Sequence, residues 1–94
     1  MLIHEIIWPQ ERIEHIALHG VVPSEVNEVC FGKPLILRAK SKGESPAYYV
    51  LGQSSAERYL FAVILRLPDG KGYPVTARPM TDTERRRYHQ WKNR

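Results

Sequence analysis

The segment YLFAVILRLPDGKGYPVTAR, residues 59–78, decides the fold that this sequence predicts. Tyr59–Leu67 is apolar except for Arg66 and is rich in branched and aromatic side chains, which is typical of a central strand. Pro68–Gly72 is a strong turn signal, and Tyr73–Arg78 is a second run with strand character. The segment therefore predicts an antiparallel hairpin in the middle of a sheet.

Upstream of the hairpin, turn chemistry divides the chain into short elements. We expect Ile3–Trp8 to form a short first strand. Pro9 suits the first turn of a helix, which we expect to run to about His19 and to stop at Gly20. Residues 23–31 also open on a proline and place apolar side chains on one stripe, which predicts a second short helix.

Two further strands precede the hairpin. Leu35–Ala39 and Ala47–Gly52 have strand composition, and the segment between them, residues 40–46, is a polar loop. With the elements on either side, the expected order is β-α-α-β-β-β-β-α. This order predicts a single α+β domain over residues 1–94, with two N-terminal helices, an antiparallel meander sheet of four to five strands and a C-terminal basic helix.

The last helix is marked by its start and by its charge. Thr81 and Glu84 are spaced as a capping box, so we expect a helix from there to about Lys92. Beyond residue 83, the bases are Arg85–Arg87, Lys92 and Arg94, and they face the single acid Glu84.

Positive charge is concentrated in the later part of the chain. The formal net charge is +4, but residues 1–32 contain one base and five acids, a net of −4. Residues 33–94 contain thirteen bases and five acids, a net of +8. A basic surface attracts the phosphates of RNA and, equally, an acidic protein partner. The charge predicts a polyanionic partner without choosing between the two.

Composition excludes several classes of protein. The apolar content of 43% is ordinary for a folded domain, and no apolar run approaches the roughly 20 residues of a membrane span. The first residues lack the pattern of a signal peptide. One cysteine, Cys30, and four scattered histidines do not make a disulfide framework or a zinc site. We therefore expect a cytoplasmic protein without a metal.

Strand alternation predicts which side chains share each face of the sheet. If Pro68–Gly72 closes the hairpin, Tyr73 lies opposite Leu67 and Arg78 lies opposite Ala62. Arg66 and Arg78 then share one face, and the more uniformly apolar second face is expected to carry the helices. The arginine face comprises Tyr48, Val50, Leu60, Ala62, Ile64, Arg66, Thr76 and Arg78, and the second face comprises Tyr49, Leu51, Tyr59, Phe61, Val63, Leu65, Val75 and Ala77.

Short motifs in a definite order extend over most of the chain. They are Trp8-Pro9, His19-Gly20, Leu51-Gly52, Arg58-Tyr59-Leu60, Thr76-Ala77-Arg78, and Thr81 followed by Glu84-Arg85 and Tyr88. In this order and spacing they resemble the BrnT family of ribonuclease toxins from type II toxin–antitoxin pairs. Leu18 and Ala47 stand where that family usually has basic residues.

The resemblance implies a RelE-like fold and cleavage of RNA without a metal or other cofactor. It also implies two partners, RNA and a cognate antitoxin protein from an adjacent gene, and no association with a membrane. A second function stays open, a non-catalytic BrnT-like module that binds a partner protein or RNA. Arg66 and Arg78 favour the enzyme, whereas Leu18 and Ala47 favour the binding module.

Metal-free RNA cleavage needs a base, an acid and cations around one phosphate. The candidate catalytic residues are Arg66 and Arg78 as phosphate-binding cations, and His19 or Tyr88 as the proton donor. The further candidates for RNA binding are Arg58, Arg85 and Lys92.

Each candidate catalytic residue has a structural alternative. Arg66 precedes a turn and could be a solvated strand end, and Arg78 could pair with a carboxylate at the start of the last helix. His19, beside a helix-stopping glycine, could complement the helix dipole. Tyr88 could simply pack in the core.

Overall fold

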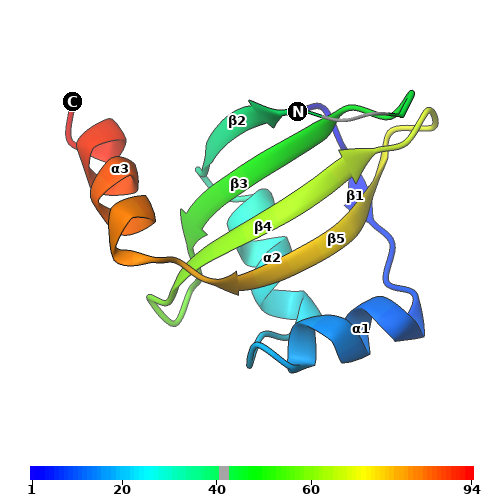
Figure 1. Ribbon diagram of the computed structural model, residues 1–94, viewed down its shortest axis with the longest axis horizontal. Coiled ribbons are helices and arrows are strands. Elements are labelled where there is room, and N and C mark those ends of the chain that lie inside the picture. Colours follow the sequence, from blue (N-terminus) through cyan, green and yellow to red (C-terminus); the bar gives the residue numbers. More distant parts are fainter. Residues whose placement is uncertain (41–42) are drawn as a thin grey trace.

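One mixed sheet of five strands organises the computed structural model, which describes residues 1–40 and 43–94 (Figure 1). The strands lie in the order β1-β5-β4-β3-β2, with β2 to β5 forming an antiparallel meander and β1 running parallel to β5. This arrangement confirms the predicted α+β class. The strands are β1 (Glu5–Ile6), β2 (Leu35–Ala39), β3 (Ala47–Gln53), β4 (Tyr59–Arg66) and β5 (Lys71–Pro79).

In the part of the chain that the structure describes, three helices complete the order, and their ends follow local chemistry. They are α1 (Gln10–Ala17), α2 (Pro23–Cys30) and α3 (Asp82–Lys92). Gly20 has φ of 72°, so it provides the left-handed residue that was expected after the first helix. The polar loop expected at residues 40–46 contains residues 41–42, which lie outside the described part of the chain.

The capping box predicted at the start of α3 is confirmed. The Glu84 backbone N–H donates to Thr81 Oγ1 at 3.2 Å, and the Thr81 backbone N–H donates to Glu84 Oε1 at 2.8 Å. Both groups are donors that a helix start otherwise leaves without a partner. The helix therefore begins where the sequence predicted.

The predicted hairpin register is wrong. Gly70 has φ of 86° and closes a tighter turn, in which its N–H donates to the Leu67 carbonyl at 2.9 Å. The Leu67 N–H then donates to the Lys71 carbonyl at 2.8 Å, so the loop is Pro68–Gly70 and Tyr73 pairs with Leu65 rather than with Leu67. A glycine that accepts positive φ lets the strands start pairing two residues earlier than predicted.

A bulge in β5 changes the face on which Arg78 lies. Ile64 pairs with Pro74 but Val63 pairs with Thr76, so Val75 is an extra residue in the ladder. Its carbonyl accepts a hydrogen bond from Arg12 Nη1 at 3.0 Å. One extra residue inverts the alternation beyond it. Arg78 therefore pairs with Phe61 instead of Ala62, and the prediction that it shares a face with Arg66 is wrong.

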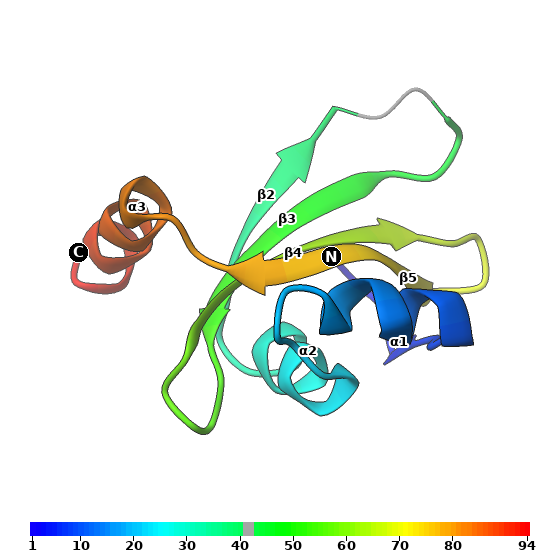
Figure 2. The same cartoon turned by 60° about the horizontal axis from the view of Figure 1, so that its bottom comes forward.

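The helix layer covers the sheet face opposite to the one expected. Figure 2 shows α1 and α2 together on one side of the sheet, with α3 apart from them. Val50, Leu60 and Ile64 are buried against this layer together with Ile16 of α1 and Val26 of α2. The predicted arginine face is thus the main core. It is apolar because the bulge removes Arg78 from it and Arg66 stands at the strand end.

The opposite face is only partly covered. The last helix contacts β2 and β3, where Tyr88 and Met80 join Leu35, Leu51 and Phe61 in a second, smaller core. The remainder of this face, around Leu37, Tyr49 and Val63, has no helix of the described residues over it, and we call it the open sheet face (Figure 2). Within the described residues, no helix combines the length and apolar character needed to cross a membrane.

Candidate nucleic-acid interface

The open sheet face is hollowed beside the first turns of α3. The hollow measures about 490 Å³ and is bounded by strand side chains on its floor and by charged side chains on its rim. Because the four antiparallel strands alternate, every floor residue comes from the set that points away from α1 and α2. The lining residues are Leu37, Tyr49, Leu51, Phe61, Val63, Arg78, Glu84 and Arg87.

Two aromatic rings lie in this floor. Tyr49 of β3 and Phe61 of β4 have ring centroids 5.4 Å apart, with an angle of 37° between the ring planes. Tyr49 is 39% exposed, so part of its ring is available to a ligand. Large aromatic groups exposed on a rigid sheet can stack on planar ligands with little loss of side-chain entropy.

Arg78 stands on the rim in a strong ion pair. Its Nη1 and Nη2 donate to Glu84 Oε1 and Oε2 at 2.8 and 2.9 Å, and its guanidinium carbon lies 4.2 Å from the centroid of the Phe61 ring. The hydrogen bond with Glu84 raises the pKa of Arg78, and the hydrogen bond with Arg78 lowers the pKa of Glu84. The alternative predicted for Arg78, a pair with a helix carboxylate, is confirmed. Its charge is already compensated in the free protein.

The neighbouring cations of α3 point in different directions. Arg87 is exposed on the rim of the hollow and has no carboxylate within ion-pair distance among residues 1–40 and 43–94. Arg85 packs its guanidinium carbon 4.4 Å from the centroid of the Tyr59 ring, and Arg86 Nη2 donates to Thr83 Oγ1 at 3.2 Å. Successive residues are turned by about 100° around a helix. Of these three arginines, only Arg87 lines the hollow.

Arg66 lies far from Arg78. In the β4–β5 ladder Arg66 lies opposite Gly72, at the hairpin end of the sheet, and its Nε donates to the Leu2 carbonyl at 3.2 Å. Phe61, the partner of Arg78, is five positions earlier in the same strand, which is about 17 Å of extended chain. The two arginines also belong to opposite faces, so the structure does not bring this predicted catalytic pair together.

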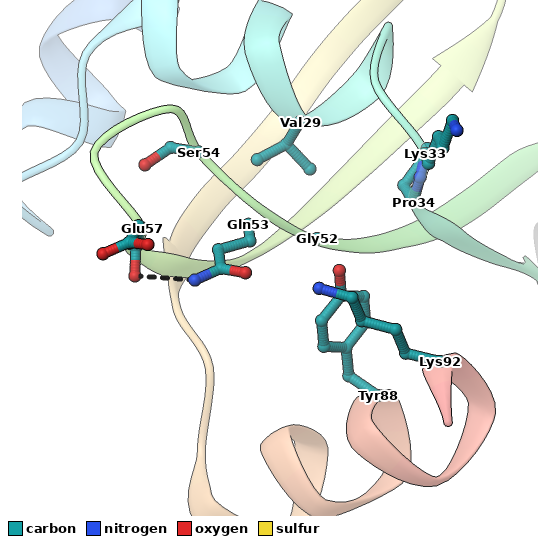
Figure 3. Close-up of a pocket in the computed structure, with 9 residues that line it drawn as sticks. All are labelled: Val29, Lys33, Pro34, Gly52, Gln53, Ser54, Glu57, Tyr88 and Lys92. Carbon is teal, nitrogen blue, oxygen red and sulfur yellow. Dashed lines mark hydrogen bonds between the residues drawn. The ribbon is translucent and has the colours of Figure 1, made fainter. Parts of the chain in front are cut away.

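Neither predicted proton donor faces the hollow. His19 is exposed just after α1, where its ring packs edge-on against His15 with centroids 5.6 Å apart. Tyr88 is only 3% exposed, which confirms the alternative that it packs in the core. Its hydroxyl lies in a separate hollow, beside Gln53 and Lys92 (Figure 3).

The predicted RNA-binding residues are also dispersed. Arg58 Nη1 donates to both carboxylate oxygens of Glu25, at 2.9 and 2.7 Å, and to the Gly20 carbonyl at 3.0 Å. This arginine therefore ties the β3–β4 turn to α2 and to the loop before it. Arg85 is beside Tyr59, and Lys92 lies by the hollow that contains the Tyr88 hydroxyl.

Four of the residues that line the hollow were not identified from the sequence. Tyr49 and Phe61 were assigned to a face that the helices were expected to cover, and Glu84 was given only a capping role and a possible pairing role. Arg87 was one of three equivalent arginines in the sequence. The available signal was the pair of aromatic residues on neighbouring strands, but the expected position of the helices concealed it.

Comparisons with known proteins identify no family. No protein-family model matches the chain, and no curated protein matches it either. Among residues 1–40 and 43–94, no three His, Cys, Asp or Glu side chains are grouped in a way that could hold a metal ion. The resemblance to the BrnT family stays a prediction from the motifs.

Proposed function

We propose that this protein is a non-catalytic, BrnT-like module that binds single-stranded RNA on the open sheet face. The observation that carries the proposal is the combination of an exposed ring, Tyr49, with Arg87, a cation that has no carboxylate partner among the described residues, around one hollow. A base would stack on Tyr49, and the adjoining phosphate would contact Arg87. Neither contact needs a particular base, because every base has an aromatic face.

The chemistry of the hollow favours single-stranded RNA over a duplex. In a duplex the base faces are stacked on one another, and only unpaired bases offer them to a protein ring. The net charge of +8 over residues 33–94 adds attraction for the backbone. Arg78 would contact RNA only if a phosphate displaced the Glu84 carboxylate from the Arg78 guanidinium, because that carboxylate already compensates the charge of Arg78.

The placement of the candidate catalytic residues favours binding over cleavage. Cleavage needs its acid, base and cations around one phosphate. Arg66 is at the hairpin end, His19 is beyond α1, and the Tyr88 hydroxyl is in another hollow. Of the predicted catalytic set, only Arg78 borders the open sheet face.

A second candidate is the metal-independent cleavage that the motif resemblance implies, with an antitoxin as protein partner. The observation that favours it is the pair of Arg78 and Glu84 on the rim. Glu84 would take the proton of the 2′-hydroxyl as its oxygen attacks phosphorus, and Arg78 would stabilise the charge on phosphorus as the bond to the 5′-oxygen breaks. Water would protonate the leaving oxygen. The lowered pKa of Glu84 makes it a weak base, which favours a slow reaction.

Fluorescence anisotropy with a labelled single-stranded RNA of twelve nucleotides tests the binding function. Tyr49→Ala should weaken binding roughly 5- to 150-fold, the measured range for loss of one stacked base. Arg87→Ala should weaken it and reduce the salt dependence, whereas the matched control Arg86→Ala should have little effect. Equal affinity for RNA in wild type and Tyr49→Ala would reject the open sheet face as the binding site.

The same RNA tests the second candidate. Products that form in the presence of a chelator, and disappear with Glu84→Gln, would favour cleavage. RNA that stays whole on prolonged incubation with saturating protein would favour the binding module. We place this function in the cytoplasm, where RNA is abundant and the buried Cys30 would remain reduced.

A further inference from the structure

Two hollows meet at the C-terminal end of α3, away from the open sheet face. One, of about 270 Å³, lies between α3, β3 and the end of α2 (Figure 3), and the other, of about 260 Å³, lies beside Trp91. Both are bordered by Lys33 and Lys92, so they adjoin. Lys92 is five positions after Arg87, roughly 140° around the helix. These hollows are therefore on a different flank of α3.

Three cations without carboxylate partners converge here. Lys33, Lys92 and Arg94 border the second hollow, and none has an acid within ion-pair distance in the part of the chain that the structure describes. Arg58 and Arg78, by contrast, are both paired. Unpaired like charges repel one another, and a bound anion relieves that repulsion. The C-terminal end of a helix carries only about half an elementary negative charge, so the helix dipole does not balance the positive charge of these three side chains.

The first hollow is a slot with an apolar floor and polar groups above it. Val29, Pro34 and the Gly52 backbone form the floor. A Cβ at Gly52 would be 2.8 Å from Val29 Cγ1 and 3.4 Å from Pro34 Cβ, which accounts for the glycine. The Tyr88 hydroxyl projects into the slot, and the carboxamide of Gln53 lies across from it (Figure 3).

The polar groups of the slot are available to a ligand. Gln53 donates through Nε2 to the Glu57 carbonyl at 3.3 Å, and its Oε1 is turned toward Tyr88 (Figure 3). Neither that oxygen nor the Tyr88 hydroxyl has a hydrogen-bond partner among residues 1–40 and 43–94. The slot therefore offers one donor and one acceptor, which suits the edge of a nucleobase. The carboxylate of Glu57 borders the same end, so an anion is excluded from it.

We propose that the paired hollows bind one nucleotide that carries a terminal phosphate. The base lies in the slot with its polar edge toward Gln53 and Tyr88, and the phosphate lies among Lys33, Lys92 and Arg94. The volume of the slot is just below the range typical of small-molecule sites, which limits it to a single base. The ligand is a nucleoside monophosphate or the phosphorylated end of an RNA, since both present this chemistry. The proposal uses none of the residues assigned to RNA on the open sheet face.

An NMR titration of the whole protein with adenosine monophosphate tests the site. We expect the amide resonances of Gly52, Gln53 and Lys92 to shift. Lys33→Ala and Lys92→Ala should each weaken binding roughly tenfold, as loss of one charge-assisted hydrogen bond predicts. Arg86→Ala, which removes a charge from α3 outside both hollows, should bind like wild type.

Three results would overturn the proposal. They are no shift at these resonances, unchanged affinity in both lysine variants, and inorganic phosphate binding as tightly as adenosine monophosphate. Weaker binding of adenosine than of its monophosphate would support the phosphate contact. Substitution of an exposed lysine usually changes the stability of a protein little. The NMR spectra of the two lysine variants show directly whether each variant is folded.

Competition identifies the source of the nucleotide. A 5′-phosphorylated RNA tetranucleotide that displaces adenosine monophosphate, when the 5′-hydroxyl form does not, would assign the site to an RNA end. Displacement by neither would assign it to a free nucleotide. Tyr49→Ala separates the two proposals, because it should weaken binding of the twelve-nucleotide RNA and leave binding of adenosine monophosphate unchanged.

Discussion

Glu84→Gln tests whether Glu84 keeps Arg78 from contacting RNA at the hollow of the open sheet face, where we propose that RNA binds. In the wild type, two hydrogen bonds of 2.8 and 2.9 Å join the Arg78 guanidinium to the Glu84 carboxylate. A neutral amide of the same shape keeps the contact with the Thr81 backbone N–H but cannot compensate the charge of Arg78. The variant therefore gains one free cation on the rim of the open sheet face.

The structure sets the expected size of two effects of Glu84→Gln, a loss of stability and a gain in RNA affinity. The paired side chains are 33% and 22% exposed, so the loss of stability should be in the lower part of the range for charge-assisted pairs, about 1–2 kcal/mol. For a domain of 94 residues, this corresponds to a fall in melting temperature of about 5–10 °C. One additional phosphate contact should raise RNA affinity roughly tenfold at low salt. It should also steepen the logarithmic salt dependence by about 0.7.

The pH dependence of stability provides a second measurement. Because the folded-state pKa of Glu84 is lowered, its contribution is complete above the ordinary carboxyl pKa and is lost as the pH falls through the lowered value. Denaturant melts of wild type and Glu84→Gln should therefore converge at acid pH and separate toward neutrality. RNA binding is measured by anisotropy between 50 and 200 mM salt. Unchanged or weaker binding by a folded Glu84→Gln variant would refute the idea that pairing with Glu84 keeps Arg78 from contacting RNA.

Three predictions concern stability and reactivity. Thr81→Ala should lower the free energy of unfolding by about 1 kcal/mol in denaturant melts because it removes the cap of α3, while Thr83→Ala should cost less; equal melts for the two would place the cap elsewhere. Glu57 has φ of 65°, so Glu57→Gly should raise stability by about 0.5–1 kcal/mol, and a lower melting temperature would contradict the strain. Burial raises the pKa of the Cys30 thiol to about 12, so iodoacetamide at pH 8 should modify it only in denaturant. Rapid modification of the native protein would show that α2 opens.

Much of the secondary structure could be predicted because its causes lie within a few residues of each element. Gly20 ends the turn that follows α1 because glycine accepts a positive φ, and Pro23 begins α2 because the fixed φ of proline suits the first turn of a helix. Thr81 and Glu84 satisfy each other's backbone donors three residues apart. The pairing of Arg78 with Glu84 was also within reach, since only six positions separate them.

The candidate sites were harder to predict because they depend on contacts between distant segments. Tyr49 is exposed because no helix of the described residues covers it, and Tyr88 borders the same hollow as Gln53 because α3 packs against β3. Lys33 and Lys92 are 59 positions apart in the sequence and border the same hollow. No local pattern reports that such residues meet.

The sequence by itself determined the α+β class, the order of the elements, the cap of α3 and the uneven charge. These follow from composition and from interactions over a few residues. Only the tertiary structure decided which face of the sheet is open. The extra residue Val75 inverts the alternation of β5, and its carbonyl is bound by Arg12, 63 positions away. Side chains alternate with a period of two, so one inserted residue moves Arg78 from the buried face to the open one.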